Sequence, residues 1–203
     1  MRKTEAVGTV GFRMEVRSSG GPDTRFDAVG SADFEARRER YRIAVLALPG
    51  VPPGSEIQFF SDAGEQYVKP PGSQAFVRVP ESEQSPVPNG VTDSLGALAT
   101  DVTEITHAGS GAVAGVPCAR YRARLDGDKV AERADLGRAA EAKRRAAALD
   151  DAPVSLCVDE RGLLREFTVE FEVPGSGGHT LRAVAELRDF GKPPPLPPFE
   201  EIR

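Results

Sequence analysis

The two histidines and two cysteines of this sequence are its first candidates for acid–base, redox or metal chemistry. His107 and His179 both stand near glycines in stretches that read as turns, so we expect exposed loop histidines. The sequence contains no G-x-S-x-G, H-E-x-x-H or C-x-x-C motif, and the common nucleophile and zinc signatures are therefore missing. We predict no catalytic residue, no metal site and no cofactor, and hence a protein that is not an enzyme.

Two acidic pairs could in principle hold a calcium ion. Asp150–Asp151 and Asp159–Glu160 each lack the spaced oxygen ligands that a calcium-binding loop supplies. We interpret the first pair as the end of a helix and the second as a hairpin turn.

The two cysteines are placed by the alternation of the segments around them. Apolar residues alternate with arginines over 119–125, and Cys118 falls on the polar side of that pattern. Cys157 likewise falls on the polar side of 154–158. Both sulfurs would then project from one face of a sheet, which allows a Cys118–Cys157 disulfide. It would close a loop of about 40 residues, stabilise the fold by about 4 kcal/mol and indicate an oxidising compartment. A pair of reduced thiols in a cytosolic protein is the alternative.

The elements that position these residues are mostly strands. Alternating apolar and polar residues with intervening turn clusters predict about ten of them. Their ranges are 10–16, 24–34, 41–47, 56–60, 66–69, 76–79, 119–125, 154–158, 163–173 and 181–187.

Two segments favour helix. Residues 128–149 are rich in Ala, Arg, Lys and Glu, which have high helix propensity. A second helix over 94–105 would carry Leu95, Leu98, Val102 and Ile105 as a narrow apolar stripe, with Asp93 or Ser94 as its cap. We expect 107–116 to be a glycine-rich turn and 81–90 to be a loop.

A largely antiparallel sheet of this size must curl or close. We therefore predict an α+β fold, a strongly curved antiparallel half-barrel of about ten strands closed by two or so helices. Residues 1–203 would form a single domain with a proline-rich extended tail over 191–203. Many inward positions hold Ala or Gly, and the space they leave would be filled either by a covering helix or by a hydrophobic ligand.

Charge limits the choice of partner. The formal net charge of −5 argues against a general nucleic-acid binder, which needs a basic surface. Arg120, Arg122 and Arg124 form a local basic stripe that could meet anionic lipid headgroups. Pairing with a row of glutamates on a neighbouring strand is the other interpretation, and the candidates are Glu166, Glu170 and Glu172.

Several short motifs carry a family resemblance. The segment 115–121 reads GVPCARY, 153–159 reads PVSLCVD, 162–165 reads GLLR and 189–191 reads DFG. In this order, and in the order of elements along nearly the whole chain, the sequence resembles actinobacterial envelope lipoproteins of the LppX/LprG type, which are similar in fold to the LolA and LolB carriers. Where that family commonly has a tryptophan in its wall, this chain has none, and Phe76 is the candidate for that place.

The resemblance implies an open LolA-like half-barrel with a hydrophobic cavity for acyl chains and no catalytic residue. It also implies an extracytoplasmic protein held at the cell membrane by a lipid-modified cysteine. Neither cysteine stands near the start of this sequence, so the signal and lipid-anchor segment would be missing from it.

We therefore predict a non-enzymatic carrier of lipid or another hydrophobic small molecule at the cell envelope, acting as a monomer. The alternative is a structural or protein-interaction module with a filled core. An enzyme using the same cavity ranks third, because Arg165 is the only charge we expect on an inward-facing position. The predicted ligand-binding wall consists of Phe12, Met14, Phe26, Tyr41, Ile43, Ile57, Phe59, Tyr121, Phe167, Val169, Phe171 and Leu181.

Overall fold

The computed structural model describes residues 2–62, 65–80, 91–133, 149–172 and 177–192. The predicted loop over 81–90, most of the predicted helix over 128–149 and nearly all of the proline-rich tail lie outside these residues.

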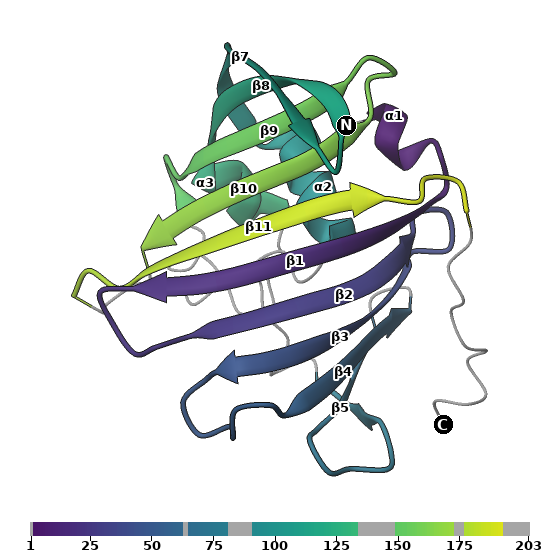
Figure 1. Cartoon of the computed structure of the whole chain (residues 1–203), viewed down its shortest axis with the longest axis vertical. Helices are drawn as coiled ribbons and strands as arrows, with labels where there is room; N and C mark the ends of the chain where they lie inside the picture. The colour runs from purple at the N-terminus through teal and green to yellow at the C-terminus, as the bar shows by residue number, and fades with distance from the viewer. Residues whose placement is uncertain (1, 63–64, 81–90, 134–148, 173–176, 193–203) are drawn as a thin grey trace.

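The described strands form one antiparallel sheet of 11 strands in the order β6-β5-β4-β3-β2-β1-β11-β10-β9-β8-β7 (Figure 1). The first half of the chain builds the part from β1 to β6 and the second half builds the part from β7 to β11, so β1 and β11 join the halves. The strands are β1 Thr9–Ser19, β2 Arg25–Asp33, β3 Arg38–Ala47, β4 Glu56–Asp62, β5 Glu65–Lys69, β6 Val77–Arg78, β7 Val102–Val113, β8 Val116–Leu125, β9 Pro153–Asp159, β10 Leu164–Glu172 and β11 Thr180–Arg188.

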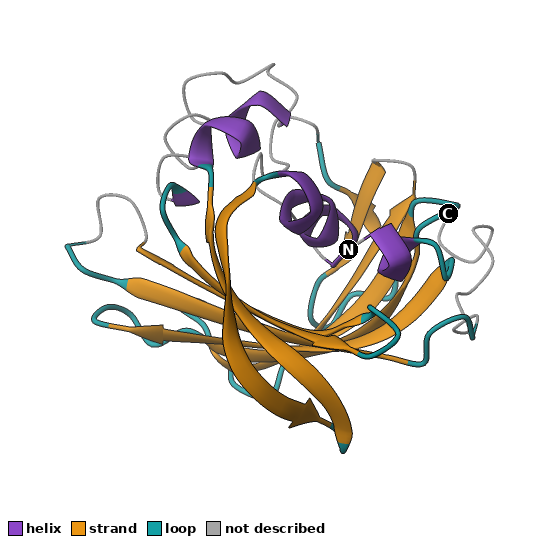
Figure 2. Ribbon diagram, turned by 90° about the horizontal axis from the view of Figure 1, so that it is seen from above, coloured by secondary structure: helices purple, strands orange, loops and turns teal. Residues whose placement is uncertain are grey.

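The sheet is strongly curved, and the helices lie on its concave side (Figure 2). They are α1 Arg2–Glu5, α2 Val91–Thr100 and α3 Gly127–Arg133. The predicted α+β half-barrel is therefore confirmed. An open curved sheet has one face that needs covering and one that meets water, which is why the strands alternate in sequence.

The register brings inward residues from distant segments into lateral rows. One row crosses eight consecutive strands from β8 to β4. Its members are Tyr121, Leu156, Phe167, Ala185, Met14, Ala28, Ile43 and Ile57.

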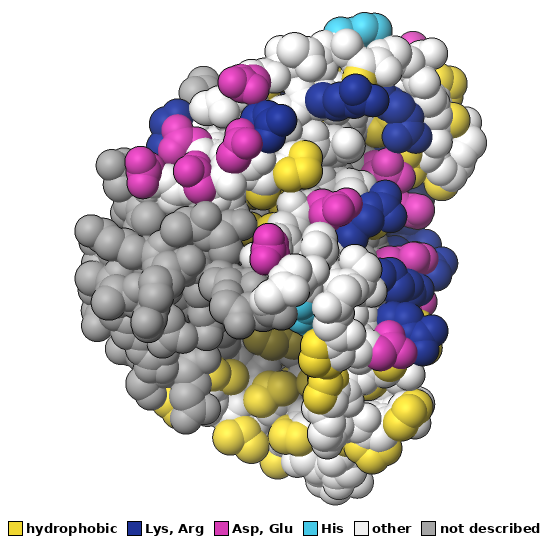
Figure 3. All heavy atoms as spheres, turned by 90° about the vertical axis from the view of Figure 1, so that its left-hand side faces the viewer, with side chains coloured by type: hydrophobic (Ala, Val, Ile, Leu, Met, Phe, Trp, Pro, Cys, Tyr) yellow, Lys and Arg dark blue, Asp and Glu magenta, His cyan; other side chains and the backbone are white. Residues whose placement is uncertain are grey.

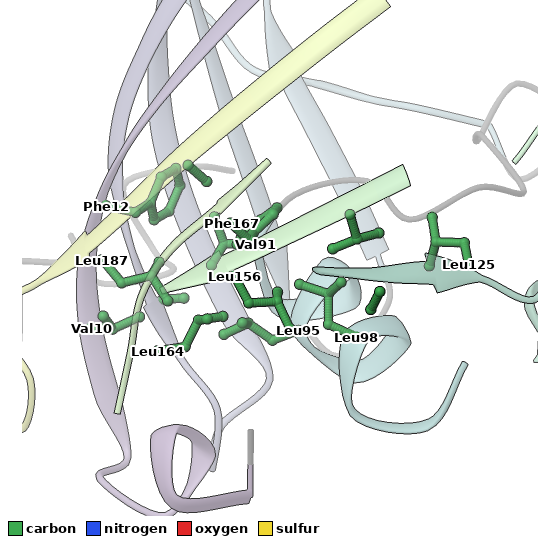
Figure 4. Packing of buried hydrophobic residues seen from close by; sticks show 14 of the residues in the cluster. Val10, Phe12, Val91, Leu95, Leu98, Leu125, Leu156, Leu164, Phe167 and Leu187 are labelled. Atoms are coloured by element: carbon green, nitrogen blue, oxygen red, sulfur yellow. The ribbon is translucent and has the colours of Figure 1, made fainter. Parts of the chain in front are cut away.

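Helix α2 packs across the concave face. Its buried residues Val91, Leu95 and Leu98 join a core cluster with side chains of the surrounding strands (Figure 4). The partners drawn there from the sheet include Val10, Phe12, Leu125, Leu156, Leu164, Phe167 and Leu187.

The prediction for this helix was wrong at both ends. Helix α2 begins at Val91, ahead of the proposed caps, and ends at Thr100. Val102 and Ile105 belong to β7 instead, so the predicted turn over 107–116 is also wrong and the sheet gains a strand. The β-branched residues of 102–106 favour extended backbone. The apolar i, i+3, i+7 spacing continues past Thr100, so the spacing alone gave no sign that the helix ends there.

The disulfide is confirmed. Cys118 and Cys157 are bonded, with their Cα atoms 5.5 Å apart. In the ladder Cys118 lies opposite Asp159 and Cys157 opposite Arg120, so the bond runs diagonally between β8 and β9. Both cysteines are buried.

The basic stripe pairs with the glutamate row at one position among the described residues. Arg120 lies 3.6 Å from Glu166. Arg124 instead contacts Glu104 at 3.4 Å and Asp151 at 2.8 Å. These are partly exposed pairs, which contribute little to stability individually.

Candidate functional site

The concave face carries the residues predicted to bind ligand. Phe12, Tyr41 and Phe167 are buried, and they belong to the core cluster that includes α2. The other nine predicted wall residues are half-buried, namely Met14, Phe26, Ile43, Ile57, Phe59, Tyr121, Val169, Phe171 and Leu181. We call these nine the open concave residues. Their role in binding a ligand stays a prediction.

Most of the open concave residues pack against the core cluster. Phe26, Ile57 and Leu181 lie beyond it. Phe26 and Leu181 pair with residues near the end of β1, whereas Ile57 lies on β4 in the row of Met14. The concave face is therefore sealed by α2 over part of its area and less covered elsewhere. In the space-filling view, hydrophobic side chains gather in the lower part of the molecule, whereas opposite charges alternate along its right-hand edge (Figure 3).

Aromatic rings form one wall of this face. The rings of Tyr41 and Phe59, on neighbouring strands, are stacked with their centroids 4.6 Å apart. Tyr41 also meets Phe12 edge to face. Such pairs stabilise by about 1 kcal/mol beyond the area they bury.

A buried carboxylate, that of Glu39, lies on the same side of the sheet. It was not among the residues predicted from the sequence. Glu39 is 2% exposed and sits on β3 two residues before Tyr41. Its Oε2 accepts hydrogen bonds from the backbone N and the hydroxyl of Thr92, each 3.2 Å long. Thr92 is in the first turn of α2, where backbone N–H groups lack helical partners and the helix dipole favours a negative charge. The prediction that Arg165 is the only inward charge was therefore wrong. The available signal was that Glu39 has the same parity in its strand as Tyr41, which was predicted to face inward.

Arg165 lies in a bulge of β10. The register shifts between Leu164 and Glu166, and Leu164 is fully buried in the core cluster, whereas strict alternation from the inward Phe167 would place it on the polar face. The Arg165 guanidinium donates two hydrogen bonds to Asp159, at 2.7 and 2.8 Å, and lies over the ring of Phe190 at 4.6 Å. Arg165 therefore forms a structural ion pair that links β10 to β9.

The Asp159 carboxylate is buried and has a perturbed pKa. Burial acts to raise the pKa of Asp159, but hydrogen bonds from the Leu163 amide and the Arg165 guanidinium outweigh it, and the pKa lies below its ordinary value. A carboxylate held in its charged form by two structural partners is a fold element rather than a general base.

The two histidines differ from each other. His107 is exposed as predicted, although it lies on a strand and its ring meets Tyr121. His179 is 9% exposed and packs against Gly21, so the prediction of an exposed loop residue was wrong there. Within the described residues no group of three or more His, Cys, Asp or Glu side chains could hold a metal ion, and no described helix is long and apolar enough to cross a membrane.

The site is thus a curved apolar face crossed by one helix, and the charged groups Glu39 and Arg165 make structural contacts. The fold occurs in solved structures of two mycobacterial proteins. LprF from Mycobacterium bovis matches with a TM-score of 0.60 at 16% identity, over 97% of this chain and 91% of that one. The Mycobacterium tuberculosis lipoprotein LppX matches with a TM-score of 0.59 at 15% identity, over 97% of this chain and 95% of that one.

The chain thus has the LppX/LprG-type fold that its motifs indicated. No protein-family description matches the sequence, and no curated protein matches it. At this level of identity the likeness concerns the fold, and the function has to be argued from this chain's own residues.

Proposed function

We propose that this protein is a non-enzymatic carrier that holds the acyl chains of lipids against the concave face of its half-barrel. The observation that carries the proposal is the set of nine open concave residues, which are apolar, point inward and remain half-buried. A folded domain normally buries such a set more completely, because each apolar side chain left half-buried forgoes part of the free energy that full burial would contribute.

The chemistry of the face suits an acyl chain. Removing apolar surface from water contributes about 25 cal/mol per Å² and requires no directional partner. The open concave residues supply aromatic and aliphatic surface, and the one polar group among them is the Tyr121 hydroxyl. Ala183 on β11, between Val16 and Val169, is a small half-buried residue of the same face.

The setting we propose is the cell envelope. A disulfide between Cys118 and Cys157 is typical of proteins outside the cytoplasm, and the protein with a similar fold from M. tuberculosis is described as a lipoprotein. We propose a lipid anchor as the means of membrane attachment, in line with the family resemblance.

The proposal is tested by asking whether the protein carries lipid. Protein exported to an oxidising compartment and purified without detergent is extracted with organic solvent, and the extract is analysed by mass spectrometry. We expect lipids with acyl chains at up to one molecule per protein, and a thermal midpoint that rises when the extracted protein is given fatty acid, since a ligand that binds only the native state stabilises it.

Absence of lipid together with no response to fatty acids would contradict the proposal. That outcome would favour an envelope protein-interaction module, for which the burial of Val91, Leu95 and Leu98 of α2 against the sheet is the supporting observation.

A further inference from the structure

The edge strand β7 places a histidine beside a tyrosine of the concave face. His107 lies opposite Tyr121 in the β7–β8 ladder, and the two rings meet edge to face with centroids 5.6 Å apart. Tyr121 is half-buried and packs against the core cluster, whereas His107 is exposed at the margin of the sheet.

An irregularity in β7 creates this pairing. Val102 lies opposite Leu125, and uninterrupted alternation from there would set Thr106 opposite Tyr121 and turn His107 to the convex face. The register instead shifts between Thr103 and Thr106, around Glu104 with its positive φ of 53°. The one-residue bulge moves His107 to the concave side, which is the way bulges re-aim side chains near functional sites.

The polar atoms of this pair are available. Within the part of the chain that the structure describes, no hydrogen bond is made by the His107 imidazole or by the Tyr121 hydroxyl. Tyr121 is one of the open concave residues. Its hydroxyl and the imidazole of His107 therefore add hydrogen-bond donors beside an apolar surface.

The arginines of β8 alternate with Tyr121, Ala123 and Leu125 and therefore project from the convex face, opposite to Tyr121. The β7–β8 segment 102–125 contains three arginines and one glutamate, a formal charge of +2 in a chain whose net charge is −5. Glu104 pairs with Arg124, and Arg120 pairs with Glu166. Arg122, opposite Thr106, is exposed on the convex face and makes no ion pair with any described residue, so hydrogen-bond donors rather than arginines would hold an anion on the concave side.

We propose that His107 and Tyr121 bind the oxyanion head, a carboxylate or phosphate, of an amphipathic lipid whose chain lies on the concave face. The inference rests on the proposed carrier function and adds to it a headgroup site and a ligand class. The tyrosine hydroxyl and the imidazole N–H both donate to the oxyanion, and hydrogen bonds to a charged group are about twice as strong as neutral ones.

The test compares ligands that differ only in the head. Binding of dodecanoate and of its uncharged methyl ester is measured at neutral pH by displacement of a fluorescent fatty-acid probe. The proteins are the native chain, His107→Ala, Tyr121→Phe and the control Thr106→Ala, which alters the exposed neighbour of His107 that faces the other side. Thermal unfolding of each variant confirms that it is folded.

We expect the native protein and Thr106→Ala to prefer the acid by at least about fivefold, since a charge-assisted hydrogen bond contributes more than 1 kcal/mol. His107→Ala and Tyr121→Phe should each reduce that preference to less than about twofold, because each variant weakens binding of the acid more than binding of the ester. Equal binding of acid and ester by the native protein would overturn the headgroup site while leaving the carrier function intact. The same conclusion would follow if His107→Ala and Tyr121→Phe weakened the binding of acid and ester equally.

Two further measurements distinguish a lipid headgroup site from a site for a free anion. Acetate and inorganic phosphate, which have the head but no chain, should not displace the probe at millimolar concentration. Displacement by either would show a simple anion site and overturn the lipid assignment. Failure of both acid and ester to bind would overturn this inference and the proposed function together.

Discussion

The ring of Tyr41 on β3 meets the ring of Phe12 on β1 edge to face, with 5.8 Å between centroids, although β2 runs between these strands. Strands two places apart are separated by about 10 Å. The contact is possible because β2 has Gly30 at the position opposite both residues. Without a side chain on Gly30, the Tyr41 ring can lie across β2 and reach its partner.

Gly30→Ala should lower the free energy of unfolding by about 1 to 3 kcal/mol, the usual cost of overpacking. A Cβ atom at Gly30 would lie 2.2 Å from the backbone oxygen of Arg40 and 2.4 Å from Cβ of Tyr41, so the backbone itself would have to move. Chemical denaturation measures the change.

The matched control is Gly11→Ala on β1, where the closest atom to an added Cβ is Oδ2 of the Asp189 side chain at 3.3 Å. A side chain can move aside, so this variant should cost clearly less. Equal costs for the two variants would show that Gly30 is not needed for the aromatic contact.

Replacing both cysteines by alanine should lower the free energy of unfolding by about 4 kcal/mol, the value for a loop of this length. The bond joins residues separated by 39 positions and therefore restricts the unfolded chain. Urea denaturation with and without a thiol reductant checks this, because the reductant should destabilise the native protein and leave the double variant unchanged. A native protein insensitive to complete reduction would count against it.

Glu39→Gln should weaken the attachment of α2 to the sheet by about 1 to 2 kcal/mol, as expected for loss of charge-assisted hydrogen bonds. The amide keeps the size of the side chain but not the charge that receives the Thr92 donors. Hydrogen exchange should accelerate in the first turn of α2. Glu56→Gln, an exposed change on β4, is the control and should leave exchange in α2 unaltered.

Stability should fall in acid partly because of Asp159. The folded-state pKa of Asp159 is lowered, so its contribution is present above the unfolded pKa of about 4 and is lost as pH falls through the lower folded pKa. The native protein should therefore lose more stability between pH 5 and strongly acidic conditions than Asp159→Asn, which is already weaker at neutral pH. Urea midpoints across this range test the prediction, with Glu160→Gln in the same turn as the control.

Ala183→Phe should reduce fatty-acid affinity at least about tenfold without destabilising the protein. Ala183 lies on the concave face between Val16 and Val169, and a phenyl ring there would occupy the place of the ligand. Affinity and thermal midpoint are measured together.

Val184→Phe, on the opposite face of the same strand between Glu15 and Thr168, is its control and should bind fatty acid normally. If Ala183→Phe instead destabilises by about 1 to 3 kcal/mol, as overpacking of a full core does, the concave face has no room for a ligand.

Much of the sheet could be predicted because alternation is a local property. β1, β8 and β9 follow their predicted ranges closely, and the parity of Cys118 and Cys157 was enough to predict their bond. The inward orientation of the wall aromatics followed from the same rule, since each strand shows its two faces in its own sequence.

The strand β7 and the end of α2 could not be predicted in the same way. The residues from Leu95 to Ile105 satisfy a helical apolar spacing, yet the chain leaves the helix at Thr100 because Val102 can pair with Leu125 on β8. That competing partner is brought alongside by the fold, and a spacing rule applied to one segment does not contain it.

The sequence by itself therefore determined the class of fold, the polar and apolar faces of most strands and the cysteine pair. The tertiary structure decided which residues the bulges of β7 and β10 turn inward, that Glu39 meets Thr92 at a separation of 53 residues, and that Tyr121 lies beside His107. The physical reason is that side-chain alternation arises within a strand, whereas a register shift or a helix cap depends on a partner that only folding brings near.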